Sequence, residues 1–173
     1  MNAQVLISYA SKYGATGAIA EAIGEILKKD GLSVDVVPVD QVQDISSYEA
    51  VILGSAVYMG SWRKKAARFL KDHESELARK EVWLFSSGPT GEGDPKELLK
   101  GWTLPPKLKA LADRIQVQDI AVFGGALDTD KLNSFDKWII KRVKGPVGDF
   151  RNWEAIKRWA EEIGSALKMG VPV

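Results

Sequence analysis

Apolar residues gather in five short runs along this chain, and polar segments separate the runs. They are rich in Val and Ile and cover Gln4–Ser8, Val34–Val39, Ala50–Ser55, Val82–Ser87 and Ile120–Ala126. Continuous apolar runs of this length are typical of strands that are buried on both faces of a parallel sheet. The pattern therefore predicts five strands.

Between these runs, apolar residues recur at the spacing of amphipathic helices. The first helix ends at Gly31, which suits the position after a helix C-cap, and Asn152 suits the N-cap of the last helix. The three stripes are Ile19, Ile23, Ile26 and Leu27; Trp62, Ala66, Phe69, Leu70 and Leu77; and Trp153, Ile156, Ala160, Ile163 and Leu167. Alternating strands and helices predict right-handed βαβ units in an α/β, doubly wound parallel sheet. We expect residues 1–173 to form a single domain.

The composition of the chain excludes several kinds of binding site and redox centre. The chain has 24 Lys and Arg against 23 Asp and Glu, so its formal charge of +1 gives no general attraction for nucleic acid, and we expect no nucleic-acid partner. It has no cysteine, which excludes disulfides, thiolate redox couples and cysteine-ligated metal clusters. Its one histidine, His73, has no second histidine beside it, and we expect no metal site. Redox chemistry would therefore need a bound cofactor.

The cellular location is predicted from two sequence features, the pattern of the first residues and the length of the apolar runs. Met1–Gln4 leads directly into the first apolar run, without the pattern of a secretory signal. No apolar run approaches the roughly 18 to 20 residues of a membrane span. We expect a cytoplasmic protein.

A small, hydroxyl-rich segment leaves the first strand and enters the first helix. It consists of Ser11, Lys12, Tyr13, Gly14, Ala15 and Thr16. Backbone N–H groups at a helix N-terminus, together with two hydroxyls, can surround a phosphate monoester. Neither a Walker pattern nor a Gly-x-Gly-x-x-Gly pattern is present, which disfavours triphosphate and dinucleotide sites. The alternative is an ordinary polar turn between a strand and a helix.

Two further loops follow buried strands and open at the same edge of the sheet. Open α/β sheets bind ligands at this edge, beyond the carboxyl ends of their strands. Tyr58 and Met59 offer an aromatic face and a polarizable sulfur to a flat ring, whereas Trp62 suits either this role or the core. The predicted contact residues are Ser55, Ala56, Val57, Tyr58, Met59 and Gly60 in one loop, and Ser87, Gly88, Pro89, Thr90, Gly91 and Glu92 in the other.

Ser11–Thr16 resembles the hydroxyl-x-x-Gly-x-Thr phosphate loop of the flavodoxin family, and the match extends along nearly the whole chain. The resemblance implies a flavodoxin-like sheet of order 2-1-3-4-5 and a bound FMN, with the phosphate at the first loop and the flavin ring between the other two. Within this family the sequence is most similar to the menaquinone-dependent protoporphyrinogen oxidase group. The similar segments are Gly125–Leu127, Phe135–Lys141 and Asn152–Glu154.

The chain departs from that group over Gly88–Arg114. The group carries a long basic insertion there, whereas this sequence has Gly91–Glu97, which is mixed in charge, and then Pro105-Pro106. We predict a loop over Gly88–Pro106, with Trp102 either packed in the core or lining a substrate opening. The resemblance implies an FMN-dependent oxidoreductase acting on an organic substrate or a quinone, with no catalytic side chain required. The alternatives are an electron-carrier flavodoxin that serves redox proteins and an interaction module without flavin.

Lys131–Lys144 predicts a basic amphipathic helix. Leu132, Phe135, Trp138, Ile139 and Val143 share one face, and Asp136 is its one acid among Lys131, Lys137, Lys141, Arg142 and Lys144. Such a helix either packs its apolar face on the core or lies on an anionic membrane surface. The second interpretation makes the protein peripheral at the membrane, and the sequence leaves both open, as it does the oligomeric state.

Overall fold

The computed structural model describes residues 3–88, 93–127, 129–131, 133–143 and 148–170. Its strands are β1 (Gln4–Ala10), β2 (Ser33–Pro38), β3 (Ala50–Tyr58), β4 (Ser61–Trp62), β5 (Glu81–Ser87), β6 (Asp119–Phe123), β7 (Ala126–Leu127) and β8 (Gly148–Asp149). Its α-helices are α1 (Ala15–Lys29), α2 (Lys64–Asp72), α3 (Glu74–Leu77), α4 (Pro95–Leu98), α5 (Pro106–Ile115), α6 (Ser134–Val143) and α7 (Trp153–Met169). Two short 3₁₀ helices, η1 (Val39–Gln41) and η2 (Thr129–Lys131), complete the list.

The five predicted strands form one parallel sheet in the order β2-β1-β3-β5-β6. Counting only these strands, the order is 2-1-3-4-5, so the predicted fold class and order are confirmed. The short strand β4 adds to the sheet by pairing antiparallel with β3, and β7 pairs with β8 in a separate ribbon. The sequence pattern predicted none of these three short strands.

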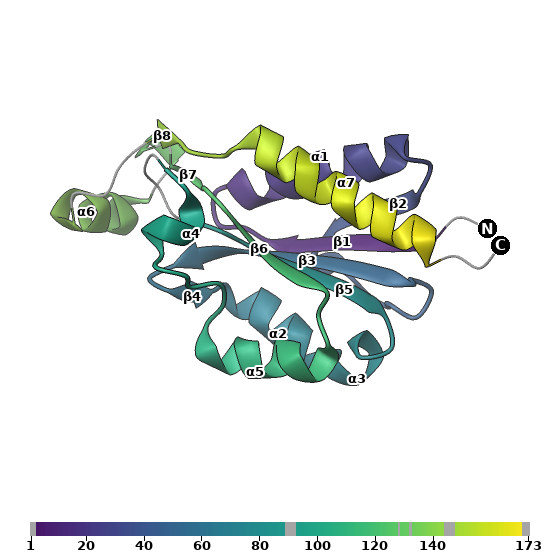
Figure 1. The fold of residues 1–173 in the computed structure, drawn as a ribbon. Helices are drawn as coiled ribbons and strands as arrows, with labels where there is room; N and C mark the ends of the chain where they lie inside the picture. Colours follow the sequence, from purple (N-terminus) through teal and green to yellow (C-terminus); the bar gives the residue numbers. More distant parts are fainter. Residues whose placement is uncertain (1–2, 89–92, 128, 132, 144–147, 171–173) are drawn as a thin grey trace.

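Helices cover both faces of the sheet, α1 and α7 on one side and α2, α3 and α5 on the other (Figure 1). Side chains alternate along each central strand to fill the two layers: in β1, Ile7 packs beneath α1 and α7, and Leu6 packs on the opposite face. The first layer includes Ile19, Ile23, Leu27, Ile156, Ala160, Ile163 and Leu167, and the second includes Ala66, Phe69, Leu70, Leu77, Leu108, Leu111 and Ile115.

Both predicted helix ends are present. After α1, the N–H of Gly31 donates to the Lys28 carbonyl and the N–H of Leu32 to the Leu27 carbonyl, with Gly31 at φ +90°. This pair of bonds is a Schellman motif, which needs a residue that tolerates positive φ. At the start of α7, the Asn152 side chain accepts the N–H of Ala155 at 3.0 Å.

Three predicted boundaries were wrong. Trp62 does not begin a helix, because it lies in β4 and its indole N–H donates to Ser86 Oγ at 2.8 Å. The helix that follows divides at His73, whose ring packs 4.6 Å from the Phe69 ring. The fifth strand ends at Phe123 and not at Ala126, because the chain beyond it pairs with another segment: Ala126 pairs with Asp149, and the N–H of Phe150 donates to the Gly125 carbonyl at 2.9 Å.

Gly88–Pro106 was predicted as a loop, yet it contains α4, and Pro106 is the first residue of α5. The structure packs Trp102 against the second core layer, which favours the packing interpretation for that residue. The model contains no helix, among the residues that it describes, long and apolar enough to cross a bilayer.

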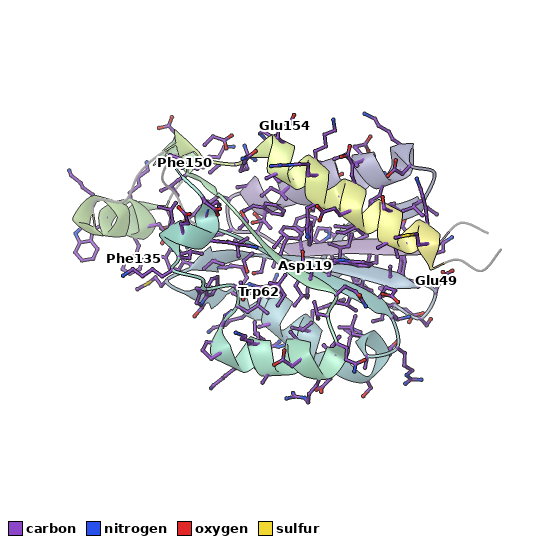
Figure 2. The ribbon with its side chains drawn as sticks, in the orientation of Figure 1. Glu49, Trp62, Asp119, Phe135, Phe150 and Glu154 are labelled. Atoms are coloured by element: carbon purple, nitrogen blue, oxygen red, sulfur yellow. The ribbon has the colours of Figure 1, made fainter. Side chains whose placement is uncertain are left out.

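α6 stands apart from both layers, beyond the carboxyl ends of the strands (Figure 1). Figure 2 shows Phe135 on this helix at one end of the molecule and Glu49, just before β3, at the other. α6 therefore lies at the end of the sheet where the predicted ligand loops open.

Candidate functional site

A cavity of about 300 Å³ lies at the carboxyl ends of β1, β3 and β5. All three predicted loops contribute to its wall, through Ser11, Lys12, Tyr13, Ala15, Thr16, Ala56, Val57, Tyr58, Met59, Ser87 and Gly88. The rest of the wall consists of Arg63, Gly125, Ala126, Leu127 and Asp136. The sheet topology thus brings together segments that are far apart in the sequence.

The first loop ends in a helix N-terminus that carries no counter-charge. Ser11 Oγ accepts the N–H of Gly14 at 2.9 Å, and Gly14 takes φ +89°, which turns the chain into α1. No side chain caps this helix start, and its first turn holds no acidic residue. The positive end of the helix dipole can therefore attract an anion at the cavity wall. Thr16, in the first turn of this helix, lines the same wall and is 1% exposed.

The second loop is a tight turn between β3 and β4. Tyr58 pairs with Ser61, so the turn consists of Met59 and Gly60, with φ +50° and +75°. Positive φ at both positions is the geometry of a type I′ turn. The Met59 side chain is 80% exposed at the cavity rim, while Gly60 only closes the turn.

Ser55 lies behind the cavity wall and holds the second loop in place. It is fully buried, and its hydroxyl donates to the Ala56 carbonyl and accepts the N–H of Arg63, both at 2.9 Å. Gly14 lines a neighbouring cavity of about 310 Å³ with Ala18 and Arg151. These two predicted residues are therefore beside the 300 Å³ cavity and not in its described lining.

The third loop packs closely on the second. A side chain at Gly88 would lie 2.9 Å from Cβ of Val57, so only glycine fits without displacing the neighbouring loop. Pro89, Thr90, Gly91 and Glu92 lie outside the described residues, and their predicted contacts stay predictions. Trp62 is 5% exposed and turned into the core, which favours the core alternative for this residue.

A cluster of charged and aromatic groups closes one side of the cavity. Asp136, from α6, is 2% exposed, and its carboxylate accepts hydrogen bonds from Lys12 Nζ, Tyr13 Oη and Tyr58 Oη. Only the Tyr58 bond, at 2.9 Å, joins this carboxylate to the second loop. Lys12 Nζ also lies 5.3 Å from the centre of the Tyr13 ring and 4.8 Å from that of Tyr58, within cation–π range.

The charges of this cluster follow from the same contacts. Burial alone would raise the pKa of Asp136, but the hydrogen bonds from Lys12, Tyr13 and Tyr58 outweigh burial and lower this pKa. The hydrogen bond to Asp136 raises the pKa of Lys12. Burial, and then the bond to Asp136, raises the pKa of Tyr58. At neutral pH the cluster therefore holds an ammonium, a carboxylate and a neutral phenol.

Sequence reasoning missed the residues that complete the wall. Gly125–Leu127 follow the fifth strand, so the rule that placed the other loops at this edge also applies to them. Arg63 follows a strand of only two residues, which is too short to recognise. Asp136 gave one signal, as the one acid of a basic helical segment. Among the described residues, no group of three or more His, Cys, Asp and Glu is arranged to hold a metal ion.

Comparisons with known proteins agree with this fold. Residues 6–152 match the family model described as "Flavodoxin domain". The chain is 26% identical over 179 residues to a protoporphyrinogen IX dehydrogenase [quinone] from Leishmania major, covering 96% of this chain and 77% of that protein. It is 23% identical to the enzyme of the same name from Escherichia coli K12, covering 92% and 94%. An archaeal flavodoxin structure superposes with a TM-score of 0.63 at 17% identity, covering 95% and 99%.

Proposed function

Because this chain belongs to the flavodoxin domain family, a family of FMN-binding proteins, we propose that it is an FMN-dependent oxidoreductase that exchanges electrons between FMN and a quinone. The observation that carries the proposal is the cavity at the carboxyl ends of β1, β3 and β5, with an uncapped helix N-terminus at one side and apolar and aromatic side chains at the other. FMN has matching parts, a phosphate dianion and a flat aromatic ring system.

The residues present suit this cofactor. The α1 N-terminus, with Ser11 and Thr16, would hold the phosphate, since backbone N–H groups and hydroxyls donate to anions. Ala56, Val57 and Leu127 would exclude water from the ring, and Tyr58 would offer it an aromatic face. FMN supplies the electron transfer, and the protein supplies binding and orientation.

Two observations support a quinone as the small redox substrate. The Leishmania major and Escherichia coli relatives are named for a quinone, and they match along most of the chain. The cavity reaches the surface near Met59, which is 80% exposed. A small acceptor would approach the flavin at this rim.

The test is catalytic turnover. Purified protein loaded with FMN is reduced anaerobically by a chemical electron donor. Menadione, a naphthoquinone, should then reoxidise it, and the cycle should repeat many times. The absorbance of the oxidised flavin falls during reduction and returns during reoxidation, so it reports both half-reactions. Reoxidation by menadione no faster than by buffer, together with fast reoxidation by a redox protein, would contradict the proposal and favour an electron carrier.

We further propose that α6 places the protein on an anionic membrane surface, where lipid-soluble quinones reside. Phe135 and Trp138 are 65% and 54% exposed, and their ring centres lie 6.3 Å apart. The exposed lysines Lys137 and Lys141 lie on the same helix. Exposed aromatic rings beside lysines suit the boundary between lipid headgroups and acyl chains. This exposure does not fit the alternative, in which the apolar face packs on the core.

Vesicle sedimentation checks this contact. The protein should bind vesicles that contain phosphatidylglycerol more strongly than pure phosphatidylcholine vesicles, and added salt should weaken the binding. Changing Phe135 and Trp138 together to serine should abolish the binding. Met169→Ser is the matched control, because Met169 is 83% exposed at the end of α7. Equal binding of the Phe135/Trp138 variant and the control would rule the contact out.

A further inference from the structure

Asp136 is a buried carboxylate on a helix whose neighbouring side chains are exposed. It is 2% exposed, whereas Phe135 and Trp138 on the same turn are 65% and 54% exposed. A buried carboxylate is costly unless it is paired and hydrogen-bonded. The fold therefore directs the Asp136 side chain toward the cavity, while Phe135 and Trp138 are exposed.

The start of α6 fixes the backbone of Asp136. Asn133 Oδ1 accepts the N–H of Asp136 at 2.8 Å, and the Asn133 carbonyl accepts the N–H of Lys137 at 2.9 Å. Asn133 therefore caps the helix, and Asp136 lies in its first turn, where the helix dipole favours a negative charge. The cap holds the backbone of Asp136, and the hydrogen bonds from Lys12, Tyr13 and Tyr58 hold its carboxylate.

The partners of Asp136 come from two different loops of the cavity. Tyr13 belongs to the loop between β1 and α1, and Tyr58 ends β3. Both phenol groups donate to the same carboxylate, and Lys12 lies over both rings. A hydrogen bond at the tyrosine hydroxyl prevents the ring from swinging about the Cα–Cβ bond, and so fixes where the ring lies. Asp136 is thus the common anchor of two aromatic rings at the cavity wall.

We propose that Asp136 is a positioning residue: through the Tyr58 hydroxyl it sets the Tyr58 ring against the flavin ring and so tunes the reduction potential of bound FMN. This inference rests on the proposed function, because it requires FMN in this cavity. Asp136 acts through Tyr58 and not on the phosphate. Its replacement therefore changes the environment of the flavin ring. Lys12 and Tyr13 of the Ser11–Thr16 loop also donate to Asp136, so the affinities for FMN and riboflavin are measured for each variant as a separate readout.

A double-mutant cycle on the bound flavin tests this coupling. The variants are Asp136→Asn, Tyr58→Phe, which keeps the ring and removes its hydroxyl, and the two together. For each, the midpoint potential and the visible circular dichroism of bound FMN are measured. If Asp136 acts through the Tyr58 hydroxyl, each single variant shifts both signals, and the double variant shifts them no further than one single variant does.

Asp35→Asn is the matched control. The Asp35 carboxylate accepts the Tyr48 hydroxyl at 2.7 Å, as Asp136 accepts that of Tyr58, and Asp35 is not part of the cavity wall. This variant should leave the potential and the visible dichroism unchanged. Far-ultraviolet circular dichroism verifies folding of every variant. Should Asp136→Asn fail to fold, Asp136→Glu takes its place in the cycle, because it keeps the charge and displaces the oxygens by one methylene.

The outcomes separate the two proposals. Additive shifts, or no shift in either single variant, would overturn the positioning role while wild-type protein still binds FMN. A wild-type protein that binds no FMN would refute the proposed function itself, and the positioning role with it.

Discussion

Replacing Gly54 by alanine is expected to lower the free energy of unfolding by about 1–3 kcal/mol, the usual cost of adding a methyl group to a packed core. The added carbon would lie 2.0 Å from Cζ of Phe85, with two further ring atoms within 2.4 Å. The Phe85 ring is fully buried and packs 6.0 Å from the rings of both Phe123 and Trp159, so it has little room to move. Urea unfolding followed by circular dichroism measures the change.

The same substitution in a Phe85→Leu background provides the control. Leucine removes the ring atoms that the new methyl group would meet, so Gly54→Ala should cost less there than in the wild-type chain. The two residues are in contact, and their effects should therefore not add. An equal cost in both backgrounds would contradict the packing between Gly54 and Phe85.

Thr16→Ala is expected to weaken FMN binding by roughly 10- to 150-fold, the equivalent of about 1.5–3 kcal/mol for one hydrogen bond to a charged acceptor. Thr16 lies in the first turn of α1 and lines the cavity. Because its hydroxyl would donate to the phosphate, riboflavin binding should hardly change. The apoprotein is titrated with each flavin, and the quenching of flavin fluorescence gives the dissociation constants of FMN and riboflavin.

Thr16→Ser separates the hydroxyl from the methyl group. It keeps the donor, so its FMN affinity should stay close to that of the wild-type protein. A Thr16→Ala variant with unchanged FMN affinity, or with equal losses for FMN and riboflavin, would contradict the assignment of Ser11–Thr16 as the phosphate loop.

The sequence predicted the parts of this fold that repeat a regular pattern. The central strands are buried on both faces, so each reads as a continuous apolar run, and three of the longer helices read as stripes at helical spacing. The phosphate loop was recognisable because the hydroxyls and glycine occupy adjacent positions in the chain. These features depend on local sequence alone. The strands and helices lie where they were predicted, apart from the boundaries at Trp62, His73 and Phe123, and the phosphate role of the loop stays a prediction.

The missed features depend on contacts between distant segments. Trp62 fits a helical stripe, but the turn at Met59 and Gly60 folds it back onto β3 as a strand. The helix α5 was missed although Leu108, Leu111 and Ile115 are spaced as a stripe, because prolines and glycines before it favoured a loop. The burial of Asp136 depends on Lys12 and on Tyr58, which are 124 and 78 positions away. No pattern within α6 reveals these partners.

One turn of α6 carries a buried side chain, Asp136, and two exposed ones, Phe135 and Trp138. This arrangement restricts how the helix can change in length. Successive residues of an α-helix are about 100° apart around its axis, because there are 3.6 residues per turn. The hydrogen bonds from Lys12 and Tyr58 hold Asp136 at the cavity, so a residue inserted between Asp136 and Trp138 would rotate everything after it by that angle. The ring that now faces outward would turn toward the flank of the helix. We therefore expect this peripheral helix to accept substitutions on its outer face far more readily than single-residue insertions or deletions, in contrast to most surface segments.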